Sequence, residues 1–74
     1  MRRLVNTSVG GIVVSFNRDA TKARAALLDR DGWEFRTHIV AAAELGSALM
    51  TLGVPADEAD RIARETLTQL HAQT

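Results

Sequence analysis

The stretch ALMTLGVPADEADRI, residues 48–62, divides the C-terminal half of the chain into two helices. Residues 41–52, which overlap its start, place apolar side chains at helical spacing, and Gly53 follows where a helix C-terminus favours glycine. Pro55 suits the first turn of the next helix, because its missing N–H would be unpaired there in any case. Residues 56–70 then keep one apolar face while charged residues occupy the other. The stretch therefore predicts two amphipathic helices joined by a tight turn.

The small and apolar residues around Gly53 look like those of a helix-turn-helix, a motif that reads DNA. Any two helices packed across a tight turn need such residues, so the likeness assigns no family. A recognition helix presents Arg, Lys, Asn or Gln to the major groove, whereas the first turn here carries Asp57, Glu58 and Asp60. Because phosphate repels carboxylates, we expect these helices to close a core rather than to bind DNA.

Strand patterns occupy the N-terminal half. Residues 4–9 and 12–16 are rich in β-branched side chains, and Gly10-Gly11 between them can form a hairpin turn. Residues 33–40 alternate as a strand with one buried face does. The side that we expect to be buried holds Trp33, Phe35, Thr37 and Ile39, and the polar side holds Glu34, Arg36 and His38.

Residues 20–28 are open to two interpretations. Asp19 can cap a short helix, and the many alanines and leucines that follow it favour that helix. Alternatively, residues 29–32, Asp-Arg-Asp-Gly, form a hairpin turn, which would make residues 23–28 a strand paired with residues 33–37.

The predicted fold is α+β: a small, mainly antiparallel sheet with two C-terminal α-helices, a helical hairpin, packed on one face. We expect a single domain over residues 1–74, since neither half could bury enough apolar surface to offset its ordering entropy. Apolar residues make up 46% and charged residues 24%, which is a globular composition.

Reinforcement by a partner is expected for so small a domain. Domains of this size are commonly stabilised by disulfides, a metal or a second subunit. The chain has no cysteine, and its two histidines lie far apart in sequence. Self-association is therefore favoured, most simply as a homodimer.

No stretch of the sequence predicts a membrane segment or a secretion signal. The longest apolar run has five residues, against roughly 20 for a bilayer span. Arg2 and Arg3 are followed by no clear apolar segment with a cleavage site. We expect a cytoplasmic protein without membrane contact.

Catalytic patterns are equally sparse. No cysteine nucleophile exists, and neither His38 nor His71 has a partner at metal-ligand spacing. Glu34 falls on the same strand side as His38, most simply as an exposed charged pair. We expect no enzyme, no cofactor and no metal.

The first C-terminal helix supplies the candidate interaction site. Its small or apolar residues outside the leucine stripe are Ala42, Ala43, Gly46 and Met50. Small residues allow close approach of another helix, although Met50 is equally suited to filling the core. The favoured function is a non-enzymatic protein–protein interaction or regulatory module that associates through this region or a sheet edge.

The alternative function is a nucleic-acid-binding regulator that uses the basic N-terminal half. Residues 1–38 carry seven Lys and Arg against four acids, and residues 39–74 carry two against five. The candidate residues are Arg2, Arg3, Arg18, Lys22, Arg24 and Arg36, with Trp33 or Phe35 able to stack on bases. Against it, both aromatics are expected in the core, and the net charge is zero.

Overall fold

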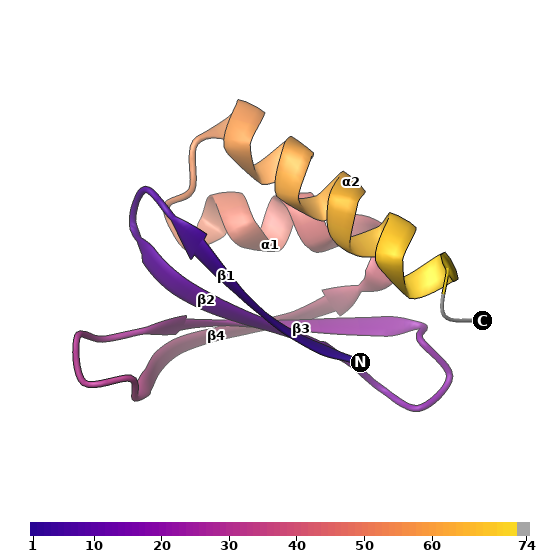
Figure 1. Cartoon of the computed structure of the whole chain (residues 1–74), viewed down its shortest axis with the longest axis horizontal. Helices are drawn as coiled ribbons and strands as arrows, with labels where there is room; N and C mark the ends of the chain where they lie inside the picture. The colour runs from indigo at the N-terminus through magenta and orange to yellow at the C-terminus, as the bar shows by residue number, and fades with distance from the viewer. Residues whose placement is uncertain (73–74) are drawn as a thin grey trace.

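A computed structural model of the chain describes residues 1–72. Its elements, in order, are β1 (Arg2–Thr7), β2 (Gly10–Phe16), β3 (Lys22–Leu28), β4 (Glu34–Ala41), the short 3-10 helix η1 (Ala42–Glu44), α1 (Leu45–Thr51) and α2 (Ala56–Ala72). The strands form one antiparallel sheet in the order β1-β2-β3-β4. Both helices lie on one side of this sheet and contact each other (Figure 1). The predicted α+β class, with a helical hairpin on one face, is confirmed.

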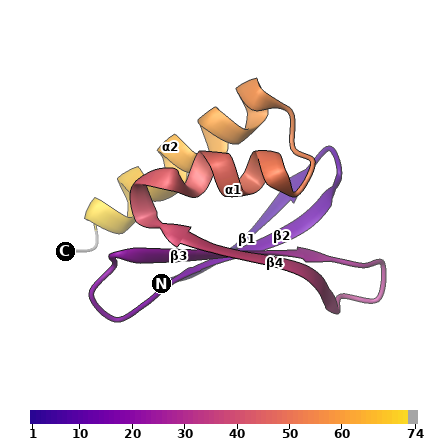
Figure 2. The same ribbon diagram turned by 180° about the vertical axis from the view of Figure 1, so that it is seen from behind.

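The sheet has a covered face and an open face. α1 packs over β3 and β4, and α2 packs against α1 and β1. Seen from behind, the helices again lie on the same side, and no helix of the described part of the chain covers the other side (Figure 2). We call this uncovered side the open face.

β3 settles the ambiguity over residues 20–28 in favour of a strand, so the short helix is wrong. The strand pairs with β2 on one side and β4 on the other. The turn after it forms as the hairpin interpretation requires: Asp29 Oδ1 accepts hydrogen bonds from the N–H groups of Asp31 and Trp33, both at 2.9 Å, and Gly32 has a φ of 86°. Pairing on both edges outweighs the helix preference of alanine.

The first hairpin turn lies two residues earlier than the predicted Gly10-Gly11 turn. Thr7 pairs with Gly10, so Ser8 and Val9 form the loop. The Thr7 hydroxyl donates to the Gly10 carbonyl at 2.7 Å and accepts from the Val9 N–H at 3.2 Å. Glu58 of α2 adds to this, because its carboxylate accepts from the N–H and the hydroxyl of Ser8, both at 2.8 Å. Side-chain hydrogen bonds therefore place the turn, while Gly10 supplies the positive φ of 130°.

The core lies between the sheet and the helices. Its largest fully buried side chains include Ile12 and Val14 of β2 and Leu45 and Leu49 of α1. β3 contributes small side chains, among them Ala25, which has no exposed surface. Small residues on this central strand allow the helices to approach the sheet closely.

The apolar side of β4 faces away from the helices, which contradicts the prediction that it is buried. The strand register aligns His38 with Ala25 and Val14 of the core, so Thr37 and Ile39 lie on the open face. Ile39 is 67% exposed, and near the start of β4, where the register shifts, Trp33 and Phe35 are 73% and 58% exposed. Alternation shows that a strand has two unlike sides, but it does not show which side the helices cover.

Gly53 ends α1, as predicted. Its N–H donates to the Met50 carbonyl at 3.0 Å, and the Val54 N–H donates to the Leu49 carbonyl at 3.1 Å. The helix itself is shorter than the predicted residues 41–52, because Ala41 ends β4 and Ala42–Glu44 form η1.

Gly53→Ala should lower the free energy of unfolding by about 1 kcal/mol, because the φ of 106° at this position is strained for any residue with a Cβ. The measurement is urea unfolding followed by circular dichroism. Gly46→Ala is the control: Gly46 lies within α1, and an added Cβ would sit at an ordinary 3.7 Å from the Ala63 Cβ. It should be neutral or stabilising, because alanine is the better helix former. Equal losses in both variants would contradict this assignment.

Candidate interaction surfaces

A groove between α1 and α2 gathers three of the four predicted interaction residues. Ala43, Gly46 and Met50 line it from the first helical segment, and Ala63 and Leu67 line it from α2, around a volume of about 370 Å³. Met50 is 51% exposed, so it is not the core-filling residue of the competing interpretation. The groove thus brings small residues together with two larger apolar side chains, Met50 and Leu67.

Ala42, the fourth residue, is not among the residues lining the groove. It is half-buried, and its N–H donates to the Thr21 carbonyl at 2.9 Å, which ties the end of β4 to the start of β3. Its role in the structure is to continue the strand pairing by one residue.

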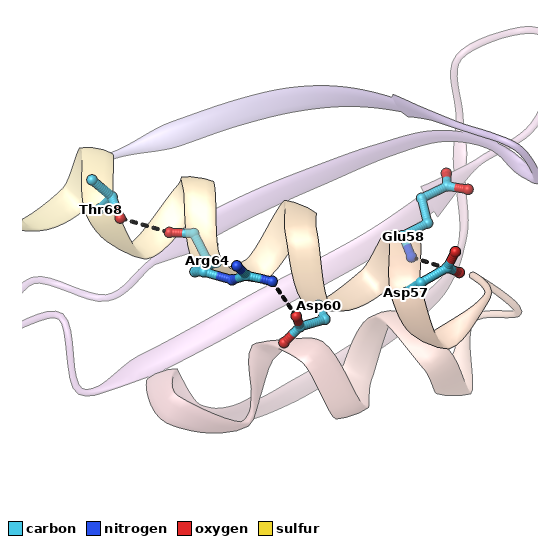
Figure 3. A network of polar contacts seen from close by, with 5 residues as sticks. All are labelled: Asp57, Glu58, Asp60, Arg64 and Thr68. Carbon is cyan, nitrogen blue, oxygen red and sulfur yellow. Dashed lines mark hydrogen bonds and ion pairs between the residues drawn. The ribbon is translucent and has the colours of Figure 1, made fainter.

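Charged side chains of α2 lie at the rim of the groove and form hydrogen bonds and an ion pair within the helix. Arg64 and Asp60 make an i,i+4 ion pair, and the Thr68 hydroxyl donates to the Arg64 carbonyl at 2.8 Å (Figure 3). Asp57 accepts from the Glu58 N–H at 3.0 Å (Figure 3). The acidic first turn of α2 is thus used within the chain, at the helix N-terminus and at the Ser8 loop.

The open face forms a second candidate surface. Two rows of paired residues cross the sheet there: Arg2, Ser15, Arg24 and Ile39 in one, and Leu4, Val13, Ala26 and Thr37 in the other. Leu4 is 61% exposed, and it lines a hollow of about 290 Å³ together with Arg2, Val13 and Leu28. The open face therefore combines apolar side chains with basic ones.

The six basic candidates of the nucleic-acid alternative do not share one face. Arg3 lies on the helix side, where it donates to the buried Thr66 hydroxyl at 2.9 Å and lies 3.8 Å from the Glu65 carboxylate. Arg2 and Arg24 belong to the same open-face row. The exposed remainder lie at the start of β3, in the turn before it and on β4: Lys22, Arg18 and Arg36.

Arg24 is paired with Glu34 rather than free to bind an anion. The two side chains form a double hydrogen bond, one arm of which measures 3.1 Å. This bond lowers the pKa of Glu34 and raises that of Arg24. The predicted pairing of Glu34 with His38 is absent from the described contacts, because His38 lies on the helix side of the sheet.

Sequence reasoning missed the exposure of Trp33 and Phe35. A signal that the sheet has apolar side chains on both faces was present in the central strands, where residues 12–14 and 25–28 are apolar without alternation. Such runs are typical of strands with two apolar faces. In the structure Val13 and Ala26, on the open face, are 4% and 0% exposed, while Val14 and Ala25 face the helices.

Other site types find little support within residues 1–72. No group of three or more His, Cys, Asp or Glu side chains is placed to hold a metal ion. Every buried side-chain nitrogen or oxygen has a hydrogen-bond partner in this part of the chain. None of its helices combines the length and the apolar character that crossing a bilayer requires.

Comparisons of the chain with protein-family models, curated proteins and solved structures found no match.

Proposed function

We propose that this protein is a small, non-enzymatic protein–protein interaction or regulatory module that associates with a second copy of itself. The observation that carries the proposal is the placement of the aromatic side chains. The chain has one Trp and two Phe, and of these Trp33 and Phe35 are mostly exposed while Phe16 packs against the core. Aromatic and Met side chains are enriched in the buried parts of interfaces.

Further exposed apolar side chains support the same function. The exposed large hydrophobic residues are Leu4, Val9, Trp33, Phe35, Ile39 and Met50. Single exposed apolar residues are normal, but several on one small domain favour a contact surface. The zero net charge means that two copies meet without long-range repulsion.

Sedimentation equilibrium tests self-association directly. Over loading concentrations from micromolar to millimolar, the weight-average mass should rise from the 8.0 kDa of one chain toward twice that value. A mass that stays at 8.0 kDa over the whole range would contradict the proposal.

A nucleic-acid-binding regulator is the second candidate, and the exposure of Trp33 and Phe35 favours it. With both aromatics outside the core, they are available to stack on unpaired bases. Under this alternative, a short single-stranded DNA should raise the sedimenting mass at low salt and less so at moderate salt.

Arg2→Ala with Lys22→Ala should then flatten the salt dependence of DNA binding, whereas Arg64→Ala, an exposed position at the rim of the groove between the helices, should leave it unchanged. A mass indifferent to DNA at low salt would exclude the nucleic-acid alternative.

A further inference from the structure

β4 is an edge strand whose outer side has no strand partner in the described part of the chain. The bond from the Ala42 N–H to the Thr21 carbonyl establishes which backbone groups face β3. Because these groups alternate along an antiparallel strand, those of His38 and Val40 also face β3. The backbone N–H and C=O groups of Thr37, Ile39 and Ala41 therefore face outward and are free to pair with another strand.

The opposite edge, β1, is protected against such pairing. The Phe16 N–H donates to the Met1 carbonyl at 3.2 Å, so by the same alternation the outward backbone groups of β1 belong to Arg2, Leu4 and Asn6. A charged residue on an edge strand disfavours strand addition. β4 also carries charged residues, Glu34 and Arg36, but both precede residues 37–41. The end of β4 is therefore the less protected stretch of edge.

We propose that a second copy of the chain adds antiparallel to β4, about a twofold axis at Ile39, so that the two sheets become one continuous sheet. This inference rests on the proposed self-association and names its contact. A twofold axis makes the contact closed and self-complementary. Each Ile39, 67% exposed in the single chain, then lies opposite its copy, and each Thr37 lies opposite Ala41 of the second copy.

The choice of axis follows from the regular part of β4. With the axis at Ile39, the paired stretch runs from Thr37 to Ala41, which lies within β4 and beyond the register shift near Phe35. An axis at Thr37 would bring Phe35, at the register shift, into the pairing. The register about Ile39 avoids this irregular part of the strand.

One edge strand and one pair of isoleucines make a small contact. Stable interfaces bury at least about 1,200 Å² in total, and smaller ones are weak or transient. We therefore expect association that responds to concentration between micromolar and millimolar, rather than a permanent dimer.

Single cysteines test the register, because the natural chain has no cysteine. In Ile39→Cys, the two opposed Cα atoms would lie about 5.5 Å apart, within disulfide range. In Thr37→Cys, the two sulfurs would be four residues apart along the paired strands, about 13 Å, which is too far. Oxidised glutathione should thus yield covalent dimer from Ile39→Cys and little from Thr37→Cys. Ser47→Cys, in the groove between the helices, should also yield little.

Placing a charge at the contact provides a second, independent readout. Ile39→Lys would oppose two ammonium groups at the axis and should weaken association at least tenfold in sedimentation equilibrium. Leu4→Lys is the matched control, because Leu4 is 61% exposed on the protected edge, and it should leave association unchanged. Circular dichroism of both variants should match that of the natural chain, since both side chains are exposed.

The outcomes separate the inference from the function on which it rests. If the natural chain associates but the cysteine variants cross-link at position 37 or 47 and not at 39, pairing about Ile39 is overturned while self-association stands. The same holds if Leu4→Lys is the variant that dissociates. A constant monomer mass would overturn both.

Discussion

Leu49→Ala should lower the free energy of unfolding by about 2–5 kcal/mol, the range for truncating a buried leucine. Leu49 has no exposed surface and lies in the core between the sheet and the helices. The stability of a native domain is roughly 0.05–0.15 kcal/mol per residue, so a chain of 74 residues would lose a large part of its total. Urea unfolding followed by circular dichroism measures the loss, and part of the variant population should be unfolded without denaturant.

Met50→Ala is the matched control for this prediction, because Met50 is the next residue in α1 and is 51% exposed. Its effect should stay within about 0.5 kcal/mol, as is usual for exposed positions. If both variants lost similar stability, the assignment of Leu49 to the core and Met50 to the surface would be wrong.

Ala25→Leu should destabilise the protein by about 1–3 kcal/mol, the cost of overpacking a well-filled core. Ala25 has no exposed surface and belongs to the core cluster beneath the helices. A leucine at this position must push α1 away from the sheet or adopt a strained rotamer, because α1 packs directly over β3. The same urea titration measures the effect.

Ala26→Leu tests whether the second face of the sheet is open. Ala26 is also 0% exposed, but it lies on the open face, in the row of Leu4, Val13 and Thr37. Because no described helix lies above that row, only neighbouring side chains must move aside for the longer side chain, and the loss should be smaller than for Ala25→Leu. A larger loss from Ala26→Leu would reverse the assignment of the two faces.

The helical half could be predicted from sequence because its signals are local. Gly53 ends α1 through its positive φ, and α2 begins directly after Pro55. Each signal depends on the backbone preference of one residue, which neighbouring elements change little. The apolar stripe of α2 likewise becomes the buried set that includes Ala59, Ile62 and Thr66.

The sheet half was less predictable, because its outcome depends on pairing between distant segments. Ala23–Leu28 has helix-forming side chains but becomes the strand between β2 and β4. Ile39 lies on the apolar side of its strand, yet the helices cover the other side. Neither result follows from one segment, since the first depends on pairing with β2 and β4 and the second on which face of the sheet receives α1 and α2.

The candidate sites, like the fold, could be predicted from the sequence only in part. Ala43, Gly46 and Met50 meet in one groove because helical spacing places them on one side of the same short segment. The basic residues were grouped only by their position in the first half of the sequence, and the structure divides them between faces. Arg3 contacts Thr66, 63 positions away in the chain, which no local pattern indicates.

Amide hydrogen exchange of β4, followed residue by residue by NMR at tens of micromolar and at millimolar protein, tests pairing through its free edge most directly. Thr37 and Ile39, whose N–H groups face outward, should exchange more slowly at the higher concentration. Val40, whose N–H faces β3, should be protected equally at both. Exchange at Thr37 and Ile39 that is rapid and independent of concentration would contradict self-association through β4.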